Sequence, residues 1–216
     1  MAWFQPCFLE PLYKFELLGL LFSLAVYNGL TLPVTFPKAF YRKLLGLPVT
    51  DINHIQDGWP ELSKGLTDLI QWTDGDVADV FVRTYEFSME LFGKRVNVDM
   101  LRTSHDADWP QAMENVHDPK TRVVRIVDDG NNSMDETDGW VSFDTNEKST
   151  HFEHPHEVEA ELVTNENREQ FVKDYIFWLT DKSIRPQYEA FARGFFVCID
   201  KKTISVCVIF FEHFIG

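Results

Sequence analysis

Residues 15–29 read FELLGLLFSLAVYNG, and they indicate the fold more clearly than any other stretch of this 216-residue chain. Apolar side chains recur here at spacings of three and four residues, which is the periodicity of one helical face. They predict a core helix over residues 11–28 that ends at Asn28-Gly29. The apolar run 17–27 is shorter than the roughly 18 residues that a membrane-spanning helix requires. The predicted core stripe consists of Leu17, Leu18, Leu21, Leu24 and Ala25.

The same periodicity predicts four further helices, and a change of period predicts strands. The helices cover residues 38–45, 60–72, 165–179 and 184–194. Residues 80–87 alternate with a period of two, which is typical of a strand, and residues 95–101 can return beside them after a turn at Gly93. We therefore expect an α+β fold that is mainly helical and contains one β-hairpin.

Acidic residues are concentrated in residues 101–161. The whole chain has 34 acidic and 20 basic side chains, a formal net charge of −14, and this segment alone holds 15 acidic and five basic ones. Such an acidic chain is repelled by nucleic-acid phosphates and by anionic lipids, so we expect neither nucleic acid nor a membrane as a partner. We interpret residues 104–157 as an insertion, in which residues 122–127 and 139–143 can form a loose hairpin.

The common catalytic motifs do not occur in this sequence. It has no P-loop, no dinucleotide-binding glycine fingerprint, no nucleophile elbow and no HExxH metal motif. His151, His154 and His156 lie close together and could hold zinc, but Pro155 interrupts any regular helix there. A solvated acidic loop is the simpler interpretation, and no metal or cofactor is predicted.

The three cysteines are predicted to be small core residues. Cys7, Cys198 and Cys207 fit no zinc-site or disulfide spacing, and free cysteine is mostly buried in proteins. Their small number is typical of a reducing compartment, and the N-terminus has no basic region that would begin a signal peptide. We therefore expect a cytoplasmic or nuclear location.

Several short motifs together resemble the N-lobe of HECT-type E3 ubiquitin ligases, and their sequence looks most like that of fungal members. The most specific is Val163-Thr164-Asn165-Glu166-Asn167-Arg168. The resemblance covers roughly residues 3–204 apart from the acidic insertion. Its other carriers are residues 15–21, 25–29, 36–46, 59–66, 84–93, 171–175 and 182–195.

The resemblance implies a docking function. In such ligases the N-lobe, which has a larger helical part and a smaller part with a β-hairpin, binds a ubiquitin-charged E2 enzyme. A C-lobe cysteine then accepts ubiquitin as a thioester and passes it to a substrate lysine. The positions here that match the family's E2 groove are Leu62, Leu66, Leu69, Trp72, Phe81, Arg83 and Phe171. For Leu66 and Leu69, plain core packing is an equally good interpretation.

Departures from the family pattern limit what this chain is expected to do. None of its cysteines lies in the sequence Thr-Cys-Phe, which surrounds the family's thioester cysteine. The sequence of residues 205–216 also differs from that of the family. We therefore expect an E2-docking N-lobe truncated before the C-lobe, with no catalytic residue of its own. The alternative is a non-catalytic protein that binds E2 or uses its acidic loop to bind a basic partner.

Overall fold

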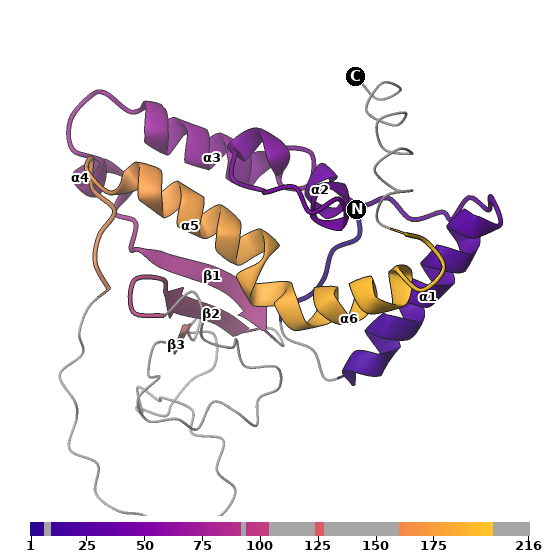
Figure 1. Ribbon diagram of the computed structural model, residues 1–216. Coiled ribbons are helices and arrows are strands. Elements are labelled where there is room, and N and C mark those ends of the chain that lie inside the picture. Colours follow the sequence, from indigo (N-terminus) through magenta and orange to yellow (C-terminus); the bar gives the residue numbers. More distant parts are fainter. Residues whose placement is uncertain (7–9, 92–93, 104–123, 128–159, 201–216) are drawn as a thin grey trace, which may run out of the picture. The chain divides into compact units, whose positions relative to one another are not determined.

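The computed structural model describes residues 1–6, 10–91, 94–103, 124–127 and 160–200 (Figure 1). Their contacts divide the chain into two units, residues 1–68 with 176–216 and residues 69–175, and each is described by itself. The elements are α1 (Leu12–Tyr27), α2 (Lys38–Leu44), the 3₁₀ turn η1 (Ile52–His54), α3 (Pro60–Gln71), α4 (Val77–Phe81), β1 (Glu86–Leu91), β2 (Lys94–Asp99), β3 (Val124–Val127), α5 (Arg168–Thr180), the 3₁₀ turn η3 (Lys182–Ile184) and α6 (Arg185–Phe195).

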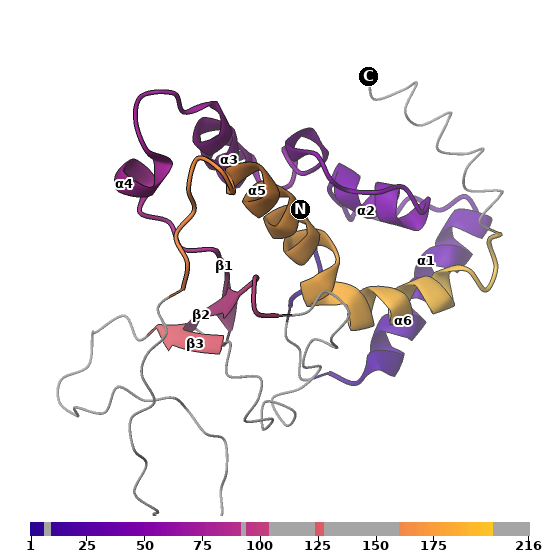
Figure 2. The same cartoon turned by 60° about the vertical axis from the view of Figure 1, so that its left-hand side comes forward.

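In the first unit, two glycines bring α1 and α6 into backbone contact (Figures 1 and 2). A Cβ atom at Gly194 would lie 1.9 Å from the carbonyl oxygen of Glu16, and one at Gly19 would lie 2.0 Å from the carbonyl oxygen of Phe191. Neither position can carry a side chain unless the helices move apart, because protein interiors are already close-packed. The small residues of α1 therefore define the face that packs on α6.

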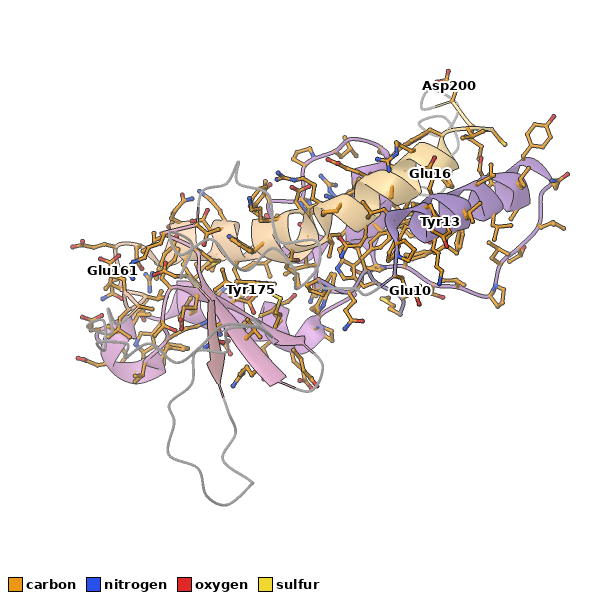
Figure 3. The ribbon with its side chains drawn as sticks, turned by 90° about the horizontal axis from the view of Figure 1, so that it is seen from below. Glu10, Tyr13, Glu16, Glu161, Tyr175 and Asp200 are labelled. Carbon is orange, nitrogen blue, oxygen red and sulfur yellow. The ribbon has the colours of Figure 1, made fainter. Side chains whose placement is uncertain are left out.

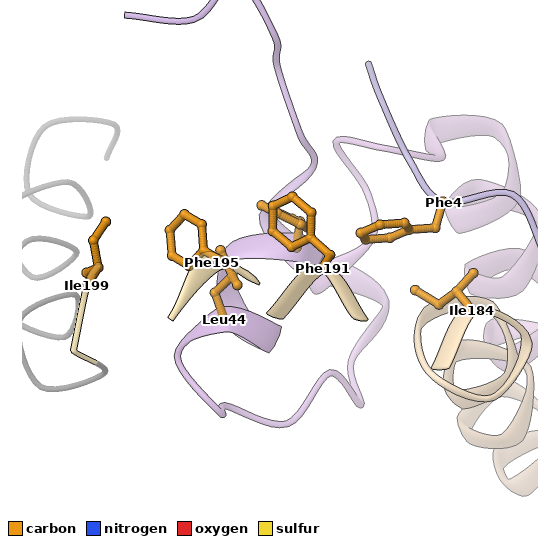
Figure 4. Close-up of a cluster of buried hydrophobic side chains, with 7 residues drawn as sticks. Phe4, Leu44, Ile184, Phe191, Phe195 and Ile199 are labelled. Carbon is orange, nitrogen blue, oxygen red and sulfur yellow. The ribbon is translucent and has the colours of Figure 1, made fainter. Parts of the chain in front are cut away.

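Phenylalanine side chains fill the core of this unit (Figure 4). The ring of Phe191 meets those of Phe4 and Phe40 with centroids 5.8 Å and 5.5 Å apart, and Phe36 stacks on Phe40 at 4.0 Å. Such aromatic pairs add specific contacts to the burial of apolar surface. The N-terminal segment, α2 and α6 thus share one core, whose buried members are Phe4, Phe40, Leu44, Ile184, Phe191, Phe195 and Ile199.

An ion-pair network joins α2 to the turn before α6. The Lys43 Nζ atom lies 2.5 Å from Asp181 Oδ1, and the Arg185 guanidinium donates to Asp181 Oδ2 at 2.6 Å and 2.9 Å. Burial alone would raise the pKa of Asp181, but the charges of Lys43 and Arg185 outweigh it and hold that pKa below its usual value. The carboxylate is therefore charged at neutral pH and serves both cations.

The second unit is built on a small antiparallel sheet in the order β1-β2-β3. Phe87 pairs with Val98 and Met89 with Val96, and all four side chains are buried. Just before β1, the Tyr85 hydroxyl donates to Asp174 Oδ2 on α5 at 2.7 Å. Burial and this hydrogen bond raise the pKa of Tyr85 well above its usual value.

Most of the predicted elements are confirmed, including the mainly helical α+β class, the hairpin and all five helices. None of the helices in the described ranges is long and apolar enough to cross a membrane. β3 falls within the predicted strand 122–127 and pairs with β2, whereas its expected partner, 139–143, lies outside the described residues. The insertion bounds, 104–157, stay a prediction for the same reason.

Two predictions about the helices and strands are wrong. Residues 80 and 81, predicted as the start of a strand over 80–87, belong instead to helix α4, because Asp76 caps that helix by accepting from the N–H of Ala78 at 3.0 Å. The expected core stripe of α1 faces solvent, since α6 approaches the side of Gly19 and Ser23. Of that stripe only Ala25 is buried, while Leu17, Leu18, Leu21 and Leu24 are 40% to 61% exposed.

Substitution of Gly194 by alanine tests the contact between α1 and α6. The new methyl group would meet backbone atoms of α1, so we expect the variant to lose about 2 kcal/mol of unfolding free energy. Gly65→Ala on α3 is the matched control, because a Cβ there meets nothing within 4 Å and should add about 0.5–1 kcal/mol. Urea unfolding followed by circular dichroism measures both. Equal stabilities for the two variants would contradict the close approach.

Candidate protein-docking site

Trp72 and Phe81 form an aromatic pair in the second unit. Trp72 directly follows α3 and Phe81 ends α4, and their rings meet edge to face with centroids 5.7 Å apart. Both side chains are partly exposed, while Val80 and Val82, on either side of Phe81 in the chain, are 52% and 68% exposed. Aromatic anchors in an exposed apolar surface are typical of protein interfaces.

Arg168, at the start of α5, holds the backbone that carries Trp72. Its Nη1 atom donates to the carbonyl oxygens of Trp72 at 2.7 Å and Leu69 at 3.4 Å. The last carbonyls of a helix have no partner within the helix, and a cation beside them also favours the negative end of the helix dipole. Arg168 therefore fixes the end of α3, from which the Trp72 side chain extends.

Asn165 holds the start of α4 in the same way. Its Oδ1 atom accepts from the N–H of Val77 at 3.3 Å, and its Nδ2 atom donates to the carbonyl oxygen of Gly75 at 3.5 Å. Asn167 bonds within the turn that carries Asn165. Residues 164–168, which we call the polar clamp, thus position both segments that bear the aromatic pair.

Arg83 packs against aromatic rings of α5. Its guanidinium carbon lies 5.2 Å from the ring centroid of Phe171 and 5.1 Å from that of Tyr175, within cation–π range. Burial raises the pKa of Tyr175, and the charge of Arg83 offsets part of that rise. The Arg83 carbonyl oxygen also accepts from the N–H of Val163 at 2.8 Å. These contacts fix the segment between α4 and β1.

The seven residues predicted to bind an E2 enzyme differ in exposure. Leu66, Leu69 and Phe171 are at most 2% exposed and pack in the interior, whereas Leu62, Trp72, Phe81 and Arg83 keep accessible surface. The structure brings Trp72 together with Phe81, and Arg83 together with Phe171. Leu62 and Leu66 belong to the other unit, so no site joining all seven is described. Their binding role stays a prediction.

Asn165 and Arg168 have no role among the sequence predictions beyond their place in the Val163–Arg168 motif. Their partners, Val77 and Trp72, lie some 90 residues earlier in the chain, at a distance that no local pattern reveals. The one feature of the sequence that could have revealed this role is the run of polar side chains before α5. It contains more hydrogen-bonding side chains than are needed to cap a single helix. Such a surplus indicates that some of these side chains bind to parts of the chain that are distant in sequence.

Cysteines and metal ligands contribute nothing to this site in the described part of the chain. Cys198 is exposed, so the prediction that it is a buried core residue is wrong: it follows α6, and its neighbour Ile199 takes the buried position. No cluster of three or more potential metal ligands occurs among the residues that the structure describes. Cys7, Cys207 and the three clustered histidines lie outside those residues.

Comparison with known families decides the relationship. The family model described as HECT-domain (ubiquitin-transferase) matches residues 1–208, nearly the entire chain.

The chain belongs to this family. It is 34% identical over 104 residues to the mouse protein named probable E3 ubiquitin-protein ligase HECTD2, a match covering 42% of this chain and 13% of the relative. To the Schizosaccharomyces pombe probable ligase mug30 it is 24% identical over 193 residues, covering 89% and 17%. To human HERC4, also named a probable ligase, it is 20% identical over 195 residues, covering 90% and 13%.

The chain covers only a small part of each of these relatives. It spans 13% to 17% of the length of these relatives, so the activity of a complete ligase does not pass to it directly. Its helices and hairpin are consistent with the HECT N-lobe. The predicted family relationship is confirmed.

Val82 provides a test of the backbone beside the aromatic pair. It ends α4 in the left-handed conformation, with φ 45° and ψ 42°, although that region strongly disfavours a β-branched residue. We expect Val82→Gly to raise the unfolding free energy by about 1 kcal/mol, because glycine adopts this conformation without strain. Val80→Gly, the control inside α4, should lower it by about 1 kcal/mol. Urea titration distinguishes the two, and a loss of stability in Val82→Gly would contradict the strained cap.

Proposed function

We propose that this chain docks a ubiquitin-charged E2 enzyme as the N-lobe of a HECT-type E3 ubiquitin-protein transferase. The observation that carries the proposal is the partly exposed Trp72–Phe81 pair, together with the polar clamp that holds the end of α3 and the start of α4. A surface that is already ordered loses little conformational entropy when a partner binds. Aromatic residues also dominate the binding energy of most protein interfaces.

Within the predicted groove, Trp72 and Phe81 are the anchors and Arg83 lies at the polar rim. Leu69 and Phe171 support this contact from within the same unit, because their side chains are buried, whereas Leu62 and Leu66 lie in the other unit and stay a separate prediction. This division of roles rests on exposure, since only an accessible side chain can contact a partner. Ubiquitin itself arrives on the E2 enzyme, and the protein substrate is left open.

Alanine substitution of the two anchors tests the docking function. Trp72→Ala and Phe81→Ala should each weaken E2 binding at least about 30-fold, because truncating an aromatic hot spot costs about 2 kcal/mol or more. Leu101→Ala is the control, since Leu101 is 50% exposed in the same unit but is not one of the predicted groove residues. It should change binding by less than about twofold. Biolayer interferometry on a panel of charged and free E2 enzymes provides the measurement.

Matching circular dichroism spectra must show that each variant is folded. Unchanged binding by both anchor variants would contradict docking at this pair.

A second candidate function follows from the charge distribution. Residues 101–161 carry 15 acidic side chains against five basic ones, which suits a basic partner of a non-catalytic interaction protein. Deleting residues 104–157 separates the two functions in the same binding assay. Docking at Trp72 and Phe81 should survive the deletion, whereas binding through the acidic segment should disappear with it.

We propose that none of the three cysteines in this sequence carries the ubiquitin thioester. Cys198 stands between Val197 and Ile199, and none of the three cysteines has the Thr-Cys-Phe setting that the family resemblance implies. Incubation with E1, E2, ATP and ubiquitin should therefore give no dithiothreitol-sensitive ubiquitin adduct on this chain. An adduct that disappears in a Cys7→Ser, Cys198→Ser or Cys207→Ser variant would contradict the assignment. The expected place of action, the cytoplasm or nucleus, remains part of the proposal.

A further inference from the structure

Arg168 carries its positive charge at the unfavourable end of its own helix. It is the first residue of α5, where the helix dipole favours an anion rather than a cation. The first turn of α5 is also capped without it. The Asn167 Oδ1 atom accepts from the N–H of Thr164 at 2.8 Å, and the Thr164 hydroxyl oxygen accepts from the N–H of Glu166 at 3.3 Å. The guanidinium of Arg168 is therefore placed to serve another element.

That element is α3, whose last turn contains no basic residue of its own. The Arg168 Nη1 atom donates to the carbonyl oxygens of Trp72 at 2.7 Å and Leu69 at 3.4 Å, both at the end of α3. A hydrogen bond from a charged donor is stronger than one between neutral groups. One side chain thus supplies both the cation and the donors that the end of α3 lacks.

The orientation of Trp72 depends on this contact, because the indole makes no hydrogen bond of its own. Its N–H is buried without a hydrogen-bond partner among the residues that the structure describes. The ring meets Phe81 edge to face, a contact that leaves the main chain of Trp72 free to turn. The hydrogen bond from Arg168 holds that main chain. It therefore determines the direction in which the side chain of Trp72 leaves the backbone.

The polar clamp that bears Arg168 is itself held on both sides (Figure 3). Before it, the Glu161 carbonyl oxygen accepts from the N–H of Tyr85 at 2.6 Å, and the N–H of Val163 donates to the carbonyl oxygen of Arg83 at 2.8 Å. After it, Tyr175 on α5 is buried in the same unit. A base fixed at both flanks can hold a distant main-chain group in one place.

We propose that Arg168 is a positioning residue for E2 docking, which holds the main chain of Trp72 so that the indole meets the partner in one orientation. The inference rests on the proposed docking function and adds to it a residue that acts through the anchor rather than by its own contact. A side chain that is ordered in advance loses less entropy on binding. Removal of Arg168 should therefore lower the affinity for E2 only while Trp72 is present.

A double-mutant cycle tests this dependence. Arg168→Met removes the charge and the donors and should weaken binding of an E2–ubiquitin conjugate about fivefold in biolayer interferometry. In a Trp72→Ala chain the same change should alter binding by less than about 1.5-fold, because no anchor remains to be positioned. Arg102→Met is the matched control. Arg102 lies in the same unit, is 47% exposed and pairs with Asp99 at 3.3 Å, so its loss should change binding by less than about 1.5-fold.

Fluorine NMR of the free chain, labelled with 5-fluorotryptophan, tests the positioning without any partner. The Trp72 resonance is assigned by its disappearance in Trp72→Phe. Arg168→Met should shift or broaden this resonance, whereas Arg102→Met should leave it unchanged. If Arg168→Met does not fold, Arg168→Lys replaces it with the same expected outcomes, because a single ammonium does not reproduce the planar guanidinium.

Three results would overturn the positioning role. They are a Trp72 resonance that the Arg168 variant leaves unchanged, an unchanged affinity in that variant while Trp72→Ala weakens binding, and an equal loss of affinity with and without Trp72. Unchanged binding by both Trp72→Ala and Phe81→Ala would instead contradict docking at the aromatic pair, so the two failures are distinguishable.

Discussion

The backbone contact between α1 and α6 is the constraint on which the first unit depends. Gly19 and Gly194 lie 175 positions apart in the sequence. At each of them the main chain of the other helix occupies the position that a Cβ atom would take in any other residue. The approach fixes the rotation of both helices about their axes. It thereby directs Phe191 and Phe195 into the aromatic core and turns the leucines of α1 outward. The core and the exposed stripe are two results of one contact.

In the second unit, polar contacts rather than close packing arrange the exposed surface. Arg168 and Asn165 satisfy main-chain groups at the end of α3 and the start of α4, where helices otherwise lack hydrogen-bond partners. Trp72, which follows α3, and Phe81, which ends α4, thereby gain a defined position without being fully buried. This combination suits a docking surface, because the backbone is ordered in advance while the anchors remain accessible.

Helices could be predicted from the sequence because apolar residues recur at helical spacings, most clearly in α3 and α6, whereas α1 is apolar on nearly all sides. The sequence did not reveal which side of each helix faces the core. Leu17 and Leu66 belong to similar leucine patterns, yet Leu17 is 53% exposed and Leu66 is 1% exposed. Only tertiary packing distinguishes them. The alternation of residues 80–87 misled for a different reason: the Asp76 cap and the left-handed Val82 define a short helix through local hydrogen bonds. The polar clamp was missed because its partners are distant in sequence.

Hydrogen–deuterium exchange on the intact chain tests the central claim most directly. Exchange would be compared with and without a stable E2–ubiquitin conjugate, peptide by peptide along the sequence. The account predicts slower exchange at residues 72–83, where the backbone lies beside the anchors, and unchanged exchange over 101–161. Protection confined to 101–161, or no protection at residues 72–83 under conditions where the conjugate binds, would contradict it.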